Sequence, residues 1–135
     1  MISTKGRYAL RVMIDLAEHE AEGYIPLKDI AERQGISKKY LEIIMRDLLK
    51  GKMVSALSGK GGGYKLAKNQ GDYSVGEILE LMEGELVPVA CMKKDFEPCS
   101  RKEYCKTLSL WKEYRETVHN FFYDKKLVDL VEEYQ

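Results

Sequence analysis

The chain has 135 residues, of which 44% are hydrophobic and 33% charged, and these proportions are typical of a folded globular protein rather than a disordered chain. A chain of this length forms one domain of ordinary size, or a small domain with an extension. No apolar run approaches the roughly 20 residues that a membrane span needs, and the first residues lack the apolar stretch of a secretory signal. We therefore expect a cytoplasmic protein with no membrane contact.

The formal net charge is zero, but the two halves of the chain differ in sign. Residues 1–70 carry 13 Lys and Arg against 8 Asp and Glu, whereas residues 71–135 carry 9 against 14. A basic half joined to an acidic half indicates two separate tasks, and the basic half suits the phosphates of DNA. The excess is modest, so it supports nucleic-acid binding without establishing it.

Apolar periodicity predicts three helices in the first fifty residues. The first spans residues 4–19, and Ile25-Pro26 opens a second, short helix that continues to about Gln34. Ser37 is a good N-cap for a third helix, which runs to about Lys50. The expected buried face of the third helix, spaced i, i+3, i+4, i+7 and i+8, consists of Leu41, Ile44, Met45, Leu48 and Leu49.

Two short strands are expected after these helices. Residues 53–57 and residues 63–67 alternate apolar with small or polar side chains, and the turn between them, residues 58–62, is rich in glycine. This pattern predicts a β-hairpin with a flexible, basic tip.

The second half is expected to be helical around an irregular segment. Ser74 and Glu77 have the spacing of a capping box and start a helix that runs to about Glu83. Residues 84–104 are irregular. A long helix then runs from near Cys105 to about Tyr123, and a tail helix spans residues 127–134. The predicted apolar stripe of the long helix consists of Leu108, Trp111, Tyr114, Val118 and either Phe121 or Phe122.

Two short helices joined by a tight glycine-containing turn and followed by a glycine-tipped hairpin have the order of a winged helix-turn-helix. The second helix of the pair is expected in the major groove of DNA. Glu42 would then accept a hydrogen bond from a cytosine amino group, and so read sequence rather than add affinity. Tyr40 is expected to contact a phosphate or to pack at the helix start. The predicted DNA-binding residues are Ser37, Lys38, Lys39, Tyr40, Glu42, Arg46, Ser58 and Lys60.

Two simpler interpretations of the same residues remain. A basic helix face is most often only a solvated face. The glycine-rich turn could be a plain loop. A phosphate cradle is the other interpretation, and it is disfavoured because the turn lacks the G-x-x-x-x-G-K-[ST] arrangement and no helix follows it directly. The DNA-binding hypothesis depends on the helix pair, the cap, the basic face and the basic wing occurring together in this order.

Three cysteines, Cys91, Cys99 and Cys105, lie close together in the irregular segment. An odd number of cysteines in a reducing compartment argues against a disulfide framework, and no C-x-x-C pair of the zinc-ribbon kind is present. Three thiolates on a loop that leads into a helix are suited to hold an iron–sulfur cluster, and the positive end of the helix dipole would lower their pKa. The alternative is that the three cysteines are unrelated.

Several stretches together match one known family. They are Ser3-Thr4-Lys5-Gly6-Arg7-Tyr8-Ala9-Leu10, Ile30-Ala31-Glu32-Arg33-Gln34-Gly35-Ile36-Ser37, Tyr40-Leu41-Glu42, Gly61-Gly62-Gly63-Tyr64, and the three-cysteine loop followed by Leu110-Trp111. On these residues the chain resembles, over essentially its whole length, the IscR/NsrR/CymR (Rrf-two) family of bacterial winged-helix regulators. The resemblance implies a homodimer, formed by the long C-terminal helices, that binds a palindromic promoter site in double-stranded DNA. It also implies that Cys91, Cys99 and Cys105 ligate a [2Fe-2S] or [4Fe-4S] cluster whose state changes which DNA is bound.

The sequence departs from the family pattern at several positions. Cluster-binding relatives take a fourth ligand from a His three residues after the last cysteine or from an acid near the N-terminus, and here those positions are Leu108 and Arg7. The first cysteine gap holds seven residues, where IscR has five. Ser58 replaces a common wing Arg, and Lys39 replaces a recognition-helix Ser. The candidate substitute ligands are the carboxylates of Asp95, Glu97 and Glu103. The alternative is a [4Fe-4S] cluster in which one iron has no protein ligand.

The sequence therefore predicts a mainly α fold with a small β-hairpin wing. The expected parts are a winged helix-turn-helix domain in residues 1–70, a linking helix and cysteine-bearing sensor loop in 71–104, and a dimerisation helix and tail in 105–135. The expected function is a homodimeric transcription regulator controlled by an iron–sulfur cluster. The alternative is a cluster-free regulator of the same family, controlled by thiol redox or a partner protein. An iron–sulfur electron-transfer protein or enzyme is a distant alternative, because no nucleophile–base motif accompanies the two histidines.

Overall fold

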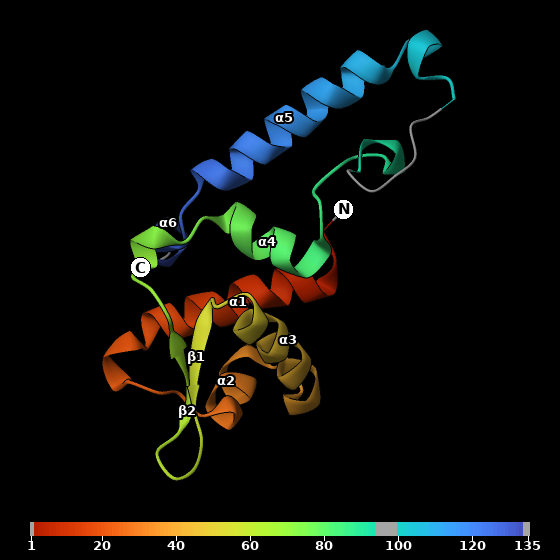
Figure 1. Ribbon diagram of the computed structural model, residues 1–135. Coiled ribbons are helices and arrows are strands. Elements are labelled where there is room, and N and C mark those ends of the chain that lie inside the picture. Colours follow the sequence, from red (N-terminus) through yellow and green to blue (C-terminus); the bar gives the residue numbers. More distant parts are fainter. Residues whose placement is uncertain (1, 94–99, 134–135) are drawn as a thin grey trace.

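The computed structural model describes residues 2–93 and 100–133 and has the predicted fold class, mainly helical with one antiparallel hairpin (Figure 1). Among the described residues, no helix is both long and apolar enough to cross a membrane. The elements in chain order are α1 (Thr4–Glu18), α2 (Leu27–Gln34), α3 (Lys38–Lys50), β1 (Val54–Leu57), β2 (Gly63–Leu66), α4 (Val75–Glu83), α5 (Leu108–Asp124) and α6 (Leu127–Glu133).

Local signals set the helix ends where the sequence predicts them. The Ser37 hydroxyl accepts a hydrogen bond from the Tyr40 backbone N–H at 3.2 Å and starts α3. Ser74 and Glu77 form both hydrogen bonds of the capping box at the start of α4. Gly35 ends α2 with φ 65°, a left-handed conformation that glycine adopts without steric cost. These caps depend only on nearby residues, which is why the helix limits were predictable.

The hairpin is anchored to the connection between α1 and α2. Val54 pairs with Leu66 and Leu57 with Gly63, so the strands are in register along their whole length. Ile25 adds an isolated bridge to Tyr64, with backbone N–O distances of 2.8 and 2.9 Å. A Cβ atom at Gly63 would overlap the backbone carbonyl of Ile25, so the close approach of the two segments requires glycine there.

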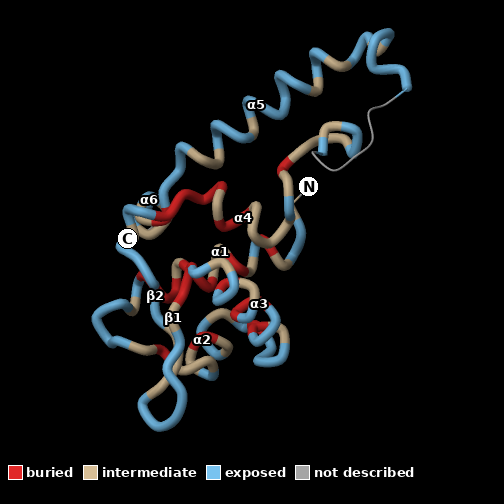
Figure 2. Tube along the Cα trace, in the orientation of Figure 1, coloured by how far each residue is buried: buried red, intermediate tan, exposed pale blue. Residues whose placement is uncertain are grey.

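The main core lies around α1, between the helix-turn-helix on one side and α4 and α6 on the other (Figure 2). Leu16 on α1 packs in one cluster with Leu48 of α3, Ile78 of α4 and Leu127 of α6. A smaller cluster joins Val75, Leu79 and Leu86. Helices α4 and α6 therefore bury their apolar faces on the same helix, α1, that supports the helix-turn-helix.

Two features of the helices differ from the sequence expectation. The prediction that Leu49 faces inward is wrong, because its side chain is 37% exposed. At about 100° per residue, Leu49 lies at the flank of the buried face formed by Leu41, Ile44 and Leu48. The long helix α5 begins at Leu108, later than expected, and none of its residues is buried in the single chain.

The predicted apolar stripe of α5 is divided between two faces. Its half-buried members are Leu108, Trp111, Val118 and Phe122. A second stripe, which is exposed and spaced i, i+4 and i+11, consists of Leu110, Tyr114 and Phe121. Figure 1 shows α5 extending away from the rest of the molecule, and none of the three exposed residues belongs to a hydrophobic cluster of the described residues; Phe121 meets only its neighbours Phe122 and Lys125.

Tyr73 joins the hairpin to the second half of the core. Its side chain is fully buried, and burial raises the pKa of its hydroxyl. The hydroxyl donates to the Met53 carbonyl at 2.7 Å and accepts from the Lys68 N–H at 2.8 Å. One phenol therefore satisfies backbone groups at both edges of the hairpin base.

Replacing Tyr73 by Phe removes both hydrogen bonds and leaves two backbone groups without this partner. We expect the free energy of unfolding to fall by about 1–3 kcal/mol, measured by urea denaturation. Tyr104→Phe is the matched control, because the Tyr104 side chain is 76% exposed and its loss should change stability little. Equal stability of the two variants would contradict the structural role of the Tyr73 hydroxyl.

Candidate DNA-binding surface and cysteine segment

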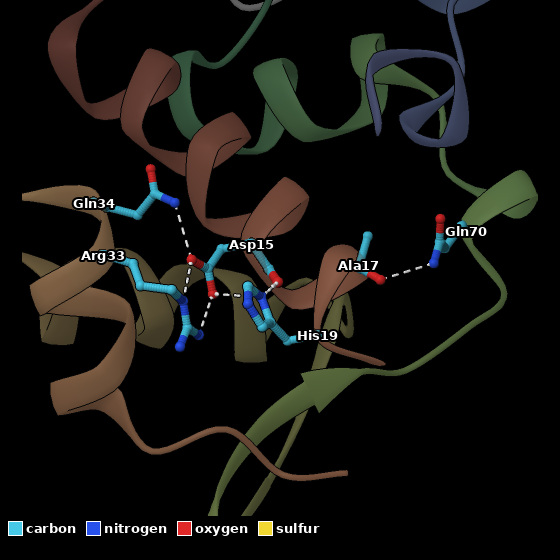
Figure 3. Close-up of polar contacts among 6 residues, drawn as sticks. All are labelled: Asp15, Ala17, His19, Arg33, Gln34 and Gln70. Carbon is cyan, nitrogen blue, oxygen red and sulfur yellow. Dashed lines mark hydrogen bonds and ion pairs between the residues drawn. The ribbon is translucent and has the colours of Figure 1, made fainter. Parts of the chain in front are cut away.

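The helix-turn-helix is held to α1 by a buried carboxylate (Figure 3). Asp15 on α1 is 1% exposed and accepts two hydrogen bonds from Arg33, at 2.7 and 3.0 Å, and one from the Gln34 side chain at 2.9 Å. His19 lies beside the same carboxylate, with Nδ1 3.7 Å from Oδ1. The last turn of α2, directly before the turn of the motif, is therefore fixed to α1 by a charge-assisted pair.

A second contact holds the same end of α2. Arg11 on α1 donates through Nε to the Gln34 side chain at 3.1 Å, and through Nη2 to the Gln34 backbone carbonyl. A cation near the last carbonyls of a helix also complements the helix dipole. Because α3 starts only four residues after Gln34, these contacts determine where the reader helix begins.

Tyr40 is placed at the start of α3 by packing. Its ring meets the ring of Tyr8 edge to face, with centroids 5.8 Å apart. The Arg11 guanidinium in turn lies over the Tyr8 ring, 5.1 Å from its centroid. Of the two expectations for Tyr40, packing at the helix start agrees with these contacts. A phosphate contact stays a prediction.

The outward face of α3 carries the predicted readers. Lys38, Lys39, Glu42 and Arg46 are all exposed, and none of them has a hydrogen bond or ion pair within the described residues. The opposite face is buried through Leu41, Ile44, Met45 and Leu48. The remaining predicted residue of α3, Ser37, is used as the N-cap. Charged side chains are thus presented on the face of α3 that the protein itself does not need for packing.

The wing projects beside the helix pair (Figure 1). Ser58 and Lys60 are both exposed in its loop, where Gly59 and Gly61 have positive φ angles. Lys65 on β2 lies over the ring of Tyr24 at 4.6 Å, which orients its strand toward the α1–α2 connection. The loop therefore presents one exposed cation, Lys60, between two glycines in a left-handed backbone conformation.

The cysteine segment is described only in part. Cys99, Asp95 and Glu97 lie outside the described residues. Cys91 is exposed and Cys105 is half-buried. A hydrogen bond with the Thr107 side chain, at 3.4 Å between Sγ and Oγ1, lowers the pKa of the Cys105 thiol. Within residues 2–93 and 100–133, no three potential metal ligands come together.

The positions of the family's fourth ligand hold other groups. Arg7 is exposed and donates to the Thr4 hydroxyl at 3.1 Å, and Leu108 is half-buried at the first turn of α5. Glu103, the described candidate among the substitute acids, is exposed two residues before Cys105. Thiolate chemistry at Cys91 and Cys105 suits iron, whereas neither Arg7 nor Leu108 supplies a donor of that kind.

The last turn of α4 connects the cysteine segment to the DNA-reading unit. The Glu83 carboxylate accepts from the Ser3 N–H at 2.9 Å and from the Ser3 hydroxyl at 2.6 Å, at the N-terminus of α1. Gly6 provides the space, because a Cβ there would overlap Glu83. Leu81 packs just as closely on Gly51 at the end of α3. Residue 84, where the irregular segment begins, directly follows this contact.

Comparison with known proteins agrees with this arrangement. The sequence pattern of the Rrf2 family, described as an iron-dependent transcriptional regulator, matches residues 2–133. The chain belongs to the Rrf2 family. Among curated Rrf2 relatives, the HTH-type transcriptional regulator IscR of Serratia proteamaculans is 38% identical over 130 residues, covering 96% of this chain and 78% of that protein. IscR of Xenorhabdus nematophila is also 38% identical over 130 residues, with the same coverage.

Solved Rrf2 structures show the same fold in two kinds of regulator. CymR (YrzC), the global cysteine regulator of B. subtilis, has a TM-score of 0.81 at 34% identity, covering 100% of this chain and 98% of that one. IscR of T. potens has a TM-score of 0.80 at 36% identity, covering 100% and 88%. The chain is thus a DNA-binding transcription regulator and not an enzyme, as the sequence predicts.

Sequence reasoning missed the residues that position the site. The buried Asp15 stands three residues after Val12 and so on the same side of α1, and an acid in such an apolar row is a signal that a basic partner lies nearby. No comparable signal marked Glu83, which reads as an ordinary charged residue near a helix end. Its role depends on Ser3, which lies 80 residues away in sequence, and on Gly6.

Replacing Asp15 by Asn keeps the size of the side chain but removes the charge that Arg33 pairs with. The hydrogen bond to Asp15 raises the pKa of Arg33, so the guanidinium stays charged and Asp15→Asn leaves this cation without its anionic partner. We expect the free energy of unfolding to fall by about 2 kcal/mol, measured by denaturant titration. Glu18→Gln, an exposed change on the same helix, is the control, and an Asp15→Asn variant as stable as this control would refute the role of the pair.

Proposed function

We propose that the protein is a homodimeric regulator in the cytoplasm whose helix-turn-helix and wing read a palindromic promoter site. The observation that carries this proposal is the outward face of α3, where Lys39, Glu42 and Arg46 are exposed on a helix whose other face is buried. In this proposal α3 enters the major groove, Ser37 starts it, and Ser58 and Lys60 of the wing meet the backbone or the minor groove. Residues 1–70 thus form the reading unit, and residues 105–135 the dimerisation part.

The proposal for dimerisation is supported by the two apolar faces of α5. One half-buried stripe faces the chain's own α4 side, and the exposed stripe of Leu110, Tyr114 and Phe121 faces away. A helix that is apolar on two sides is usually covered on both. A second copy of the same helix would cover the exposed stripe and hold two reading units at a fixed separation, as a palindromic site with half-sites about one helical turn apart requires.

We further propose that Cys91, Cys99 and Cys105 hold an iron–sulfur cluster, [2Fe-2S] or [4Fe-4S]. The similarity to IscR over most of the chain supports this proposal. So does the lowered pKa of Cys105, because the thiolate is the form that ligates iron. When bound, the cluster would supply a group sensitive to iron–sulfur supply, oxidants or nitric oxide. In this proposal the fourth ligand is Glu103 or one of the acids outside the described residues, Asp95 and Glu97. The alternative is a cluster in which one iron has no protein ligand.

The contacts of α4 suggest how the state of the cysteine segment would reach the DNA-reading unit. Glu83 binds the start of α1 through Ser3, and Lys5 in the next turn pairs with Asp47 on α3. Leu81 packs on the end of α3 at Gly51. We propose that tension on the segment after residue 84 is transmitted through these contacts and biases an equilibrium between two dimer arrangements.

The alternative is a cluster-free regulator of the same family, controlled by thiol redox or a partner protein. The likeness to CymR, a global cysteine regulator, favours it specifically, since the TM-score to CymR, 0.81, is as high as the 0.80 to IscR, and 98% of the CymR chain is covered against 88% of IscR. Exposure of Cys91 and the lowered pKa of Cys105 suit thiol chemistry as well as ligation. The two functions therefore differ in whether the three cysteines act as a set.

The deciding experiment is anaerobic purification with iron and sulfide counts, a visible absorbance spectrum, and DNA binding before and after loss of the chromophore. We expect iron and sulfide bound in stoichiometric amounts, and DNA binding that changes when they are lost. In Cys99→Ala we expect neither bound iron and sulfide nor this change in DNA binding. Ser100→Ala, an exposed neighbouring change, is the control. A colourless protein after anaerobic isolation, with unchanged DNA binding by Cys99→Ala, would remove the cluster proposal and leave the thiol alternative.

Dimerisation is tested on the exposed stripe of α5. Leu110→Glu places a charge in the proposed interface, so we expect sedimentation to shift from twice the chain mass toward the single-chain mass of 15.6 kDa. DNA with two half-sites should then bind at least tenfold more weakly. Ser109→Glu adds the same charge at an exposed position off the stripe and should remain dimeric. A dimer that persists in Leu110→Glu would contradict this interface.

A further inference from the structure

The reading face of α3 contains an exposed apolar side chain that packing does not explain. Ile43 is 41% exposed and belongs to neither hydrophobic cluster of the described residues. It lies between Ile44, which is fully buried, and Glu42, which is exposed. A single exposed apolar residue is common on protein surfaces, so exposure by itself carries no function. Its place on the helix is what distinguishes Ile43.

Ile43 lies near the middle of the face of α3 that is opposite to the core. At about 100° per residue, Lys39, Arg46 and Lys50 share this face, at positions i−4, i+3 and i+7 relative to Ile43. All three are exposed. The buried residues Leu41, Ile44 and Leu48 occupy the other side of the helix. The face that α3 presents outward is therefore a row of cations with one β-branched apolar side chain inside it.

We propose that Ile43 recognises the C5-methyl group of a thymine in the major groove. This inference rests on the proposed function, in which the outward face of α3 enters that groove. Thymine is the base that presents a methyl group on its major-groove edge, and apolar side chains contact it there. Lys39 and Arg46 on either side would hold phosphates or guanine edges and keep the helix close enough for that contact. Ile43 has a stiff, branched side chain that loses little freedom on docking.

The proposal predicts a preference for thymine over uracil, which the charged side chains of α3 cannot provide. Glu42 would select for a cytosine amino group, and Lys39 and Arg46 for guanine or phosphate oxygens. None of these side chains distinguishes thymine from uracil, because the two bases have the same hydrogen-bonding edges. A contact with the methyl group alone makes that distinction, and burial of one methyl group corresponds to about a fourfold difference in affinity.

The test is a double-mutant cycle on DNA sites selected by the intact protein from a random pool. Each thymine of the selected half-site is replaced in turn by deoxyuridine, and the dissociation constant is measured for the wild-type protein and for Ile43→Ala. We expect one position in each half-site at which deoxyuridine weakens wild-type binding about fourfold, and at which Ile43→Ala binds thymine and uracil DNA equally. Unchanged thermal unfolding of Ile43→Ala verifies that the exposed substitution leaves the fold intact.

Two outcomes overturn the proposal. One is that deoxyuridine weakens binding at no position, and the other is that its effect is the same in the wild type and in Ile43→Ala. Glu42→Ala, measured on the same sites and on sites with altered bases, separates the causes of failure. If Glu42→Ala relaxes base preference while the cycle shows no coupling, α3 reads DNA and the inference about Ile43 is wrong. If neither variant changes binding to any site, α3 is not the reader and the proposed function fails as well.

Discussion

The position of α3, the second helix of the helix-turn-helix, depends on one carboxylate. Asp15 lies on the buried face of α1, where an ionised group is stable only if it is paired, and Arg33 and Gln34 at the end of α2 supply the pairing. The turn between Gln34 and the start of α3 at Lys38 is too short to absorb a movement of α2. The contact of Asp15 with the end of α2 therefore also fixes the position of α3. A hydrophobic contact at the same place would tolerate sliding, whereas a bidentate ion pair fixes distance and direction together.

The same helix α1 receives the second half of the chain on its other side. Tyr73, Ile78 and Leu127 enter its core cluster, and Glu83 binds its first turn through Ser3. The segment that carries the cysteines therefore leaves from a helix already attached to the reading unit. Any force on that segment acts on a close-packed contact rather than on a flexible linker, and close-packed contacts transmit displacement because they have no free volume to absorb it.

The likeness to both IscR and CymR is consistent with a scaffold that serves different signals. TM-scores of 0.80 and 0.81 show that this fold is shared with IscR and with the global cysteine regulator CymR. Function in such a family is decided by the residues on the scaffold rather than by the scaffold. In this chain the distinguishing residues are the cysteine set, Leu108 and Arg7 at the family's ligand positions, and the mixed row of Lys39, Ile43 and Arg46 on the reading face.

The sequence by itself determined the helices, the hairpin and which charged residues lie on the exposed face of α3, because Ser37, Ser74 and Gly35 act within a few residues and periodicity separates the two faces of a helix. It erred at Leu49, where the edge of a buried face depends on how neighbouring elements curve around it. Only the tertiary structure decided the partners of Asp15 and Glu83 and the division of α5 into two apolar faces. Those features are contacts between residues far apart in the chain, and a one-dimensional pattern carries no information about which distant side chain fills a given space.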